Sequence, residues 1–304
     1  MLEIIKLEKS YGKIKALDNI NLSIPEGEIF GVIGQNGAGK TTLLKIMAGL
    51  LEPDRGSVSM DGKELTEKAA GGSCEIGYVP DHYQLYDRLK VMEYLEFYAG
   101  LYEINIKKKK QWLLELLELV QLSEQSNMYI ENLSQGMRQK LCVARALLPD
   151  PKILILDEPG SGMDPKARVE FKDTLKTLCG GKRTIIISSH MVAGLPDYCT
   201  SIGILEKGKM ILEGDMEEVM TGIRKNQPLI IQVLDMEEQA VKTLKACPYV
   251  KKLSLENKSF TVLFDGNDEE EAELLSALIQ GRVPVQRFYR ETGDLESRFL
   301  DLIS

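Results

Sequence analysis

The chain has 304 residues, of which 43% are hydrophobic and 28% are charged, and its formal net charge is −8. At about 150 residues per domain, this length predicts roughly two domains, with enough chain to bury a core without disulfide or metal support. The composition excludes a disordered or fibrous chain, and the excess of acidic side chains argues against a nucleic-acid partner, whose phosphates favour a basic surface.

No apolar run approaches the ~18 residues needed to cross a bilayer, and an amphipathic strand pattern starts directly after Met1. We therefore expect no signal peptide and a cytoplasmic location. The five cysteines are scattered and lack C-x-x-C spacing. They predict reduced thiols, and neither a disulfide framework nor a zinc site.

Residues 1–222 are predicted to form an α/β domain in which β-rich segments alternate with helices. The runs 152–156 and 184–187 are almost continuously apolar, as in strands that are buried on both faces of a parallel sheet. Between about 86 and 148 the pattern is mostly helical, which predicts a helical subdomain. The strands expected from the pattern are 4–7, 29–33, 153–156 and 184–187, and one helix face carries Trp112, Leu113, Leu116, Leu117 and Val120.

Residues 223–304 are predicted to form a second, small α+β domain. Its elements follow the order βαββαβ, which is the ferredoxin-like arrangement. Asn226-Gln227-Pro228 is the predicted linker, and a last helix is expected over 294–303. No phosphate, metal or nucleophile motif follows residue 222, so we expect a regulatory or dimerising role. The expected elements are strand 229–234, helix 236–246, strands 252–255 and 260–264, helix 267–280 and strand 283–289.

The segment from Gly34 to Thr41 matches the pattern G-x-x-x-x-G-K-[ST] of a phosphate-binding loop. It follows a predicted strand that ends at Ile33 and opens a helix, so backbone N–H groups and the helix N-terminus face phosphate oxygens. We expect Lys40 to reach the β- and γ-phosphates of a nucleotide and the Thr41 hydroxyl to bind Mg²⁺. The predicted nucleotide-binding residues here are Gly34, Asn36, Gly37, Gly39, Lys40, Thr41 and Thr42.

Two acids, Asp157 and Glu158, follow the apolar strand 153–156. Burying carboxylates at a strand end is costly unless a cation or a proton lies near. Beside a phosphate-binding loop, we expect Asp157 to hold Mg²⁺ through water and Glu158 to polarise the attacking water as the catalytic base.

A helix rich in Leu, Val and Ala is preceded by Leu133-Ser134-Gln135-Gly136-Met137. A serine and a glycine N–H at a helix start can form a second anion site. The segment is equally compatible with an ordinary N-cap in which Ser134 accepts a hydrogen bond, and as an isolated segment it favours this simpler interpretation.

These three motifs in this order resemble the ATP-binding cassette (ABC) ATPases, the nucleotide-binding subunits of transporters, over about residues 1–220. The Leu-Ser-Gln-Gly-Met segment is similar to the signature motif that distinguishes this family from other phosphate-loop NTPases. The resemblance implies a P-loop NTPase core, with ATP and Mg²⁺ as cofactors and Lys40 and Glu158 in catalysis. It also implies that Tyr11 stacks on adenine, that Asp164 lies in the loop that crosses the dimer, and that His190 contacts the γ-phosphate.

Two positions depart from the family pattern. Gln135 stands where the signature motif usually has a glycine, a variant that some branches tolerate. Asp81 follows Gly77-Tyr78-Val79-Pro80, where the family has a glutamine that links Mg²⁺ to the membrane subunit. A carboxylate can still bind Mg²⁺, but it is shorter and cannot donate a hydrogen bond. We therefore treat Asp81 as a candidate metal ligand; the alternative is a solvated loop residue.

A single cassette followed by a small domain resembles the ATPases of the ABC-2 type, drug- and polymer-export branch. The resemblance implies a separate membrane permease as partner and a peripheral position on the inner face of the cell membrane. It also implies a head-to-tail homodimer, or a pair with another cassette, in which Ser134 and Gly136 contact the ATP of the second copy. One alternative is a soluble cassette ATPase that acts on ribosomes or DNA, although such relatives usually carry two cassettes, a coiled-coil insertion or zinc cysteines. Another is a degraded cassette that only binds ATP, against which the intact catalytic residues argue.

Overall fold

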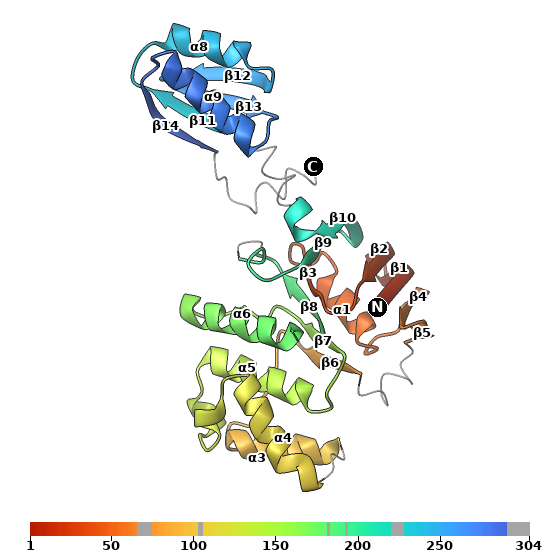
Figure 1. Cartoon of the computed structure of the whole chain (residues 1–304). Coiled ribbons are helices and arrows are strands. Elements are labelled where there is room, and N and C mark those ends of the chain that lie inside the picture. The colour runs from red at the N-terminus through yellow and green to blue at the C-terminus, as the bar shows by residue number, and fades with distance from the viewer. Residues whose placement is uncertain (66–74, 103–105, 181–182, 192–193, 220–227, 291–304) are drawn as a thin grey trace. The chain divides into compact units, whose positions relative to one another are not determined.

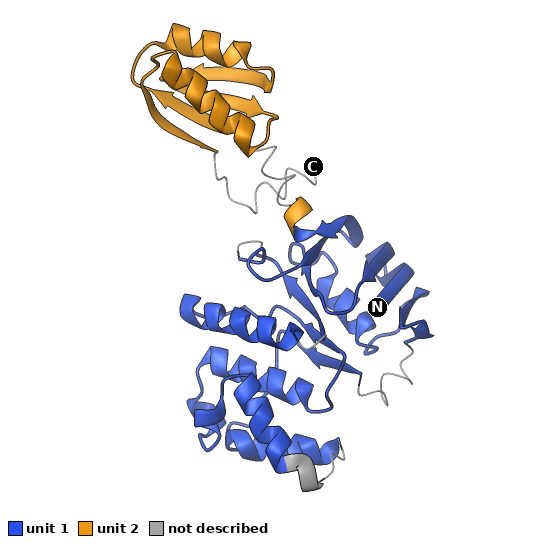
Figure 2. Cartoon of the chain, viewed as in Figure 1, with its two compact units in different colours: residues 1–216 blue, residues 217–304 orange. Residues whose placement is uncertain are grey.

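The computed structural model describes, apart from the side chains of 106–109, residues 1–65, 75–102, 106–180, 183–191, 194–219 and 228–290 (Figure 1). The chain divides into two compact units, residues 1–216 and residues 217–304 (Figure 2). The predicted boundary at 222/223, the first two linker residues and the expected helix over 294–303 lie outside the described residues.

The first unit contains an antiparallel sheet of four strands in the order β2-β1-β4-β5. Leu2, Ile4 and Leu7 of β1 are buried, whereas the residues between them, including Ile5, are more exposed. This alternation is typical of a sheet with one face on the core. Of this sheet, the sequence pattern predicted only the strand 4–7. Its strands are β1 (Leu2–Tyr11), β2 (Ile14–Ile24), β4 (Arg55–Met60) and β5 (Lys63–Glu64).

A second sheet of six strands, in the order β10-β9-β3-β8-β7-β6, forms the centre of the first unit. All its described pairings are parallel except that of β9 with β10, and every residue of β3 and β7 is buried, as the apolar runs predict. Because β3, β7 and β8 are parallel neighbours, their carboxyl ends lie at one edge of the sheet. The strands are β3 (Ile29–Ile33), β6 (Ile76–Val79), β7 (Ile153–Leu156), β8 (Thr184–Ser189), β9 (Ser201–Glu206) and β10 (Lys209–Asp215).

Helix α1 (Lys40–Met47) joins the two sheets into one hydrophobic core. Its side chains Leu43, Leu44 and Met47 are fully buried in a cluster that includes residues of both sheets. Each such burial stabilises the fold by about 1.5–3 kcal/mol. The packing of α1 therefore fixes the position of the loop that precedes it.

The predicted helical region between 86 and 148 contains three α-helices, followed by α6 after β7. The aliphatic residues of the predicted apolar face, from Leu113 to Val120, are fully buried. Trp112 is half-buried, and its indole Nε1–H donates to the Leu148 carbonyl oxygen at 3.0 Å. The helices are α3 (Val91–Leu101), α4 (Ile106–Leu119), α5 (Gln135–Leu147) and α6 (Pro165–Cys179).

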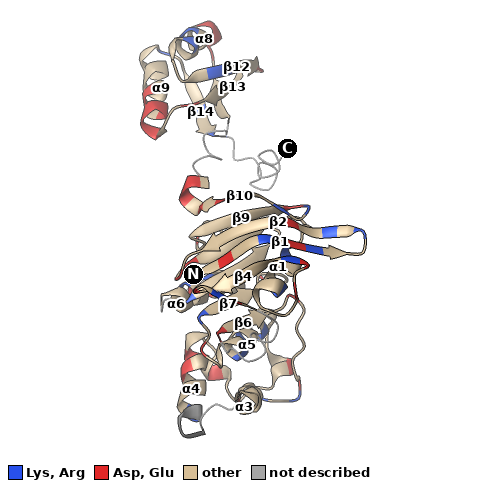
Figure 3. Cartoon of the chain, turned by 90° about the vertical axis from the view of Figure 1, so that its right-hand side faces the viewer, with Lys and Arg blue, Asp and Glu red and all other residues tan. Residues whose placement is uncertain are grey.

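The second unit has the predicted βαββαβ order, and its antiparallel sheet has the order β12-β13-β11-β14. Both helices pack on the sheet face that carries Leu229, Ile231 and Phe260. Asn267 caps α9, whose first turn is acidic (Figure 3) and therefore complements the helix dipole. The elements are β11 (Leu229–Val233), α8 (Glu237–Ala246), β12 (Val250–Glu256), β13 (Ser259–Phe264), α9 (Asp268–Gln280) and β14 (Val285–Arg290).

Candidate functional site

The predicted phosphate-binding loop connects the carboxyl end of β3 to the start of α1. Two of its glycines have no room for a side chain: a Cβ on Gly34 would collide with the carbonyl oxygen of Leu205, and one on Gly39 with that of Ala16. Gly39 also has a φ of 110°, which residues with side chains rarely adopt. The neighbouring strands β9 and β2 thus fix the path of the loop, and the first N–H groups of α1 lie where a phosphate can bind.

The Lys40 side chain lies at the base of this loop and is almost completely buried. Its Nζ donates hydrogen bonds to the carbonyl oxygens of Gly34 at 2.6 Å and Gln35 at 3.3 Å. The same Nζ lies 3.2 Å from Oε1 of Glu158, as an ion pair without hydrogen-bonding geometry. Lys40 therefore already contacts both the loop and the acid that follows β7.

Asp157 directly follows β7 and is 1% exposed. Its carboxylate accepts hydrogen bonds from the Ser188 hydroxyl at 2.6 Å and from the Tyr78 hydroxyl at 3.4 Å. Burial and the charge of Asp157 raise the pKa of Tyr78, so this hydroxyl remains a donor at neutral pH. Two neighbouring strands, β8 and β6, thus hold Asp157 from opposite sides.

Glu158 connects the ends of three strands. Its φ of 47° turns the chain sharply, and its backbone N–H donates to the Ser188 hydroxyl oxygen at 2.8 Å. While Oε1 faces Lys40, Oε2 lies 2.8 Å from Nδ1 of His190. The carboxylate is therefore held between a lysine and a histidine, an orientation suited to a base that positions water beside a phosphate.

The signature-like segment packs on the start of α6. The Ser134 hydroxyl caps α5 by accepting from the Met137 N–H at 3.3 Å, as the simpler interpretation of the sequence predicts. A Cβ on the buried Gly136 would lie 2.9 Å from that of Ala167. Asp164 in turn caps α6 by accepting from the Ala167 N–H at 2.9 Å. Ser134 and Asp164 therefore have structural roles that do not depend on a nucleotide.

Gln135, the unusual residue of the signature-like segment, contacts the loop after Glu158. Its side-chain amide nitrogen would lie 3.6 Å from a Cβ on Gly162, which itself has a φ of 72°. The Gln135 side chain therefore lies within van der Waals distance of Gly162, so the signature-like segment and this loop pack against each other.

Tyr11 lies at the tip of the β1–β2 hairpin, where it pairs with Ile14 and is 51% exposed. The hairpin continues into β2, whose Ala16 carbonyl borders Gly39. An exposed aromatic ring beside a phosphate-binding loop offers a stacking surface for a nucleotide base.

Asp81 follows β6 and lies 3.5 Å from Nε2 of the exposed His82, with 35% of its side chain exposed. Its charge also contributes to the raised pKa of Tyr78, after burial and Asp157. Asp81 is therefore close enough to act on the hydroxyl that binds Asp157.

The described residues contain no group of three or more His, Cys, Asp or Glu side chains that could hold a metal by themselves. Mg²⁺ rarely needs such a cage, because it keeps several waters and takes nucleotide phosphates as ligands. The exposed Thr41 hydroxyl and the Asp157 carboxylate fit this chemistry, since oxygen ligands at the phosphate-binding loop and at the neighbouring strand end are what such a site requires.

Comparisons with known proteins agree with this geometry. The ABC transporter family profile matches residues 17–161. The uncharacterised ABC transporter ATP-binding protein YxlF of Bacillus subtilis (strain 168) is 32% identical over 303 residues, covering 100% of this chain and 99% of that protein. The chain belongs to the ABC transporter family of ATP-binding proteins.

Other proteins similar to this ABC ATPase include an export ATP-binding protein and solved ABC cassettes. The Nod factor export ATP-binding protein I of Cupriavidus pinatubonensis is 30% identical, covering 99% of this chain and 90% of that protein. Among solved structures, cbiO1 from Clostridium perfringens has a TM-score of 0.67 at 30% identity, covering 74% of this chain and 93% of that one. A dimeric structure of MJ0796, a bacterial ABC transporter cassette, has a TM-score of 0.63 at 27% identity, covering 71% of this chain and 99% of that one.

As an ABC ATPase, the protein binds ATP and hydrolyses it to ADP and phosphate. The structure brings Lys40, Glu158 and His190 into one network. A further residue of the site, Ser188, was not among the predicted ones; its hydroxyl donates to Asp157 and accepts from the Glu158 N–H. The available signal was a serine pair at the end of an apolar strand, next to the histidine.

Proposed function

We propose that this ABC ATPase powers a separately encoded membrane permease that exports its substrate. A relative that matches 99% of the chain is named as an export ATP-binding protein, which supports transport in this direction. The described residues include no helix long and apolar enough to span a membrane. We therefore propose that the protein binds peripherally to the cytoplasmic face of the cell membrane.

The observation that carries the mechanism is the Lys40–Glu158–His190 network at the ends of β3, β7 and β8. When ATP binds, Lys40 exchanges its contact with Glu158 for phosphate oxygens. Glu158 then accepts a proton from the attacking water, and His190 keeps its carboxylate oriented while contacting the γ-phosphate.

Mg²⁺, when bound, neutralises charge on the phosphates. Thr41 and Asp157 would hold it, with Asp81 as a further candidate ligand on the loop after β6. Ser188 and Tyr78 keep the Asp157 carboxylate in place through the two hydroxyl contacts described above.

We further propose that the active form is a homodimer or a pair with another cassette. In such a dimer, Ser134, Gly136 and Asp164 contact the nucleotide bound by the second copy. The similar cassette MJ0796, at 27% identity, has a dimeric structure, which supports a dimer. Gly136 packs against Ala167, so the starts of α5 and α6 are in direct contact at this surface. The second unit, which has no nucleotide motif, is proposed to regulate or stabilise this dimer.

A surface next to the Asp81 loop suits the permease. Tyr86, Phe97, Leu101 and Tyr102 are all between 44% and 64% exposed at the start of the helical region. Exposed aromatic side chains are enriched at protein interfaces.

Acidic and basic residues are interspersed along both units (Figure 3), so we propose no nucleic-acid partner. The relatives are named as transporter proteins, which does not favour the alternative of a cassette ATPase that acts on ribosomes or DNA.

The test is co-expression with a candidate permease, for which we would take any membrane protein encoded in a neighbouring reading frame. We expect the two proteins to purify together, and we expect ATP-dependent efflux that Glu158→Gln abolishes. Light scattering should show the Glu158→Gln chain with ATP at twice the monomer mass of 34.1 kDa. Two results together would contradict the proposal: a Glu158→Gln chain that stays monomeric with ATP, and an unmodified chain that hydrolyses ATP without binding any membrane protein.

A further inference from the structure

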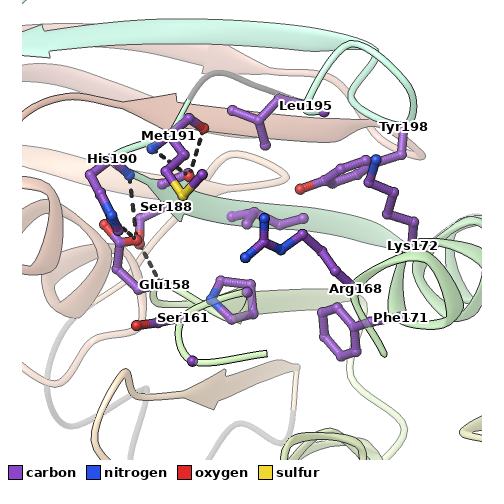
Figure 4. Close-up of a pocket in the computed structure, with 16 residues that line it drawn as sticks. Glu158, Ser161, Arg168, Phe171, Lys172, Ser188, His190, Met191, Leu195 and Tyr198 are labelled. Atoms are coloured by element: carbon purple, nitrogen blue, oxygen red, sulfur yellow. Dashed lines mark hydrogen bonds and ion pairs between the residues drawn. The ribbon is translucent and has the colours of Figure 1, made fainter. Parts of the chain in front are cut away.

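A cavity of about 150 Å³ lies between α6, β8 and the loop that follows Glu158 (Figure 4). Glu158, Ser161 and His190 line one side, whereas Arg168, Lys172 and Tyr198 line the other. One water needs about 10–15 Å³ by the same kind of measure. The cavity therefore has room for a small anion with its first water molecules, and it shares Glu158 and His190 with the catalytic network.

Arg168 is the cation best placed to bind an anion in this cavity. Its guanidinium points toward the cavity centre (Figure 4). It donates to the Met163 carbonyl oxygen at 3.4 Å, and within the described part of the chain it has no ion pair. Arg168 Nε also lies 4.0 Å from the position of a Cβ on Gly160, so the side chain reaches the loop two residues after Glu158.

The other charges around the cavity are paired. Lys172 Nζ contacts Asp197 Oδ2 at 2.6 Å and lies 5.7 Å from the Tyr198 ring centroid. The Glu158 carboxylate contacts Lys40 and His190. Lys172 stays neutralised by Asp197, and Glu158 keeps its contact with His190 after Lys40 turns to the nucleotide. The charge of Arg168 therefore determines the preference of the cavity for an anion.

We propose that this cavity binds inorganic phosphate released by ATP hydrolysis, with the Arg168 guanidinium as its main ligand. A planar guanidinium matches the oxygen spacing of phosphate and can donate two parallel hydrogen bonds to it. The Ser161 hydroxyl on the opposite wall supplies a further donor. The cavity thus gives phosphate a path that leaves ADP on the phosphate-binding loop. This proposal rests on the ATPase activity and not on the direction of transport.

The test titrates inorganic phosphate into the full chain saturated with ADP, by calorimetry. We expect Arg168→Gln to weaken phosphate binding by about 10- to 100-fold, as for one charge-assisted contact. Lys176→Gln, which removes an exposed charge from the same helix, should leave it unchanged. If Lys40→Ala abolishes phosphate binding while Arg168→Gln does not affect it, phosphate binds only at the phosphate-binding loop and the proposal is wrong.

Two further measurements keep the outcome clear. If Arg168→Gln does not fold, Arg168→Lys keeps the charge but loses the fork; it should weaken phosphate binding severalfold, and an unchanged affinity overturns the proposal. In a single turnover, quenched flow measures ATP cleavage and a fluorescent phosphate sensor measures release. Arg168→Gln should lengthen the lag between them, and an unchanged lag again contradicts the site. A chain without any ATP turnover would refute the ATPase function instead, because the phosphate titration needs no hydrolysis.

Discussion

Glu158→Gln is the most informative substitution in the catalytic network. The amide has the size of the carboxylate but cannot accept the proton of the attacking water. General base catalysis contributes about 10²–10⁴-fold in rate, so the barrier should rise by about 2.7–5.4 kcal/mol. The change also removes the negative charge 3.2 Å from Lys40 Nζ. Lys40 then has one competitor fewer for phosphate oxygens, and ATP affinity should remain equal or increase.

The assay is steady-state phosphate production at saturating ATP, together with ATP binding measured by fluorescent-nucleotide displacement. Glu118→Gln, an equal change on the exposed side of α4, is the matched control and should behave like the unmodified chain. The expected result is normal or tighter ATP binding with turnover reduced by at least about 100-fold. Unmodified turnover in Glu158→Gln would refute the assignment of the base, and loss of ATP binding would refute the argument from Lys40.

Three further predictions address other parts of the chain. Asp81→Asn should weaken the dependence of ATPase activity on Mg²⁺ concentration, and Asp81→Gln should retain ATP hydrolysis. If Mg²⁺ titrations of ATPase activity superimpose for both variants and the unmodified chain, Asp81 is not a Mg²⁺ ligand. Phe260→Ala should cost about 3–5 kcal/mol in the second unit, seen by calorimetry, without weakening ATP binding; weaker ATP binding would contradict the separate roles of the units. Burial raises the pKa of the Cys142 thiol to about 12, so this thiol is protonated at pH 8. Iodoacetamide, followed by mass spectrometry, should therefore label the half-buried Cys247 much faster than Cys142. Equal labelling rates of the two cysteines would contradict the burial of Cys142.

The regular elements of the second unit follow from the sequence because their patterns are local. Alternating apolar residues and the polar turn at Asn257-Lys258 predict the hairpin of β12 and β13, and α9 begins directly after its capping residue Asn267. In the first unit, the strands β2 and β4 were not identified, because their apolar residues face a core that α1 and the second sheet complete. A pattern that depends on a distant partner is weak when only the local sequence is read.

Three local motifs predict the chemistry of this protein: a glycine loop ending in Lys40, an acid pair after an apolar strand, and a histidine after another strand. These motifs are short because each depends on a turn at one strand end. How these groups meet depends on the folded chain, because β3, β7 and β8 come from distant parts of the sequence. Their parallel register brings Glu158 between Lys40 and His190. The same register gives Ser188 its two contacts and packs α6 beside β8, which forms the cavity around Arg168; no local pattern encodes contacts between residues so far apart in the chain.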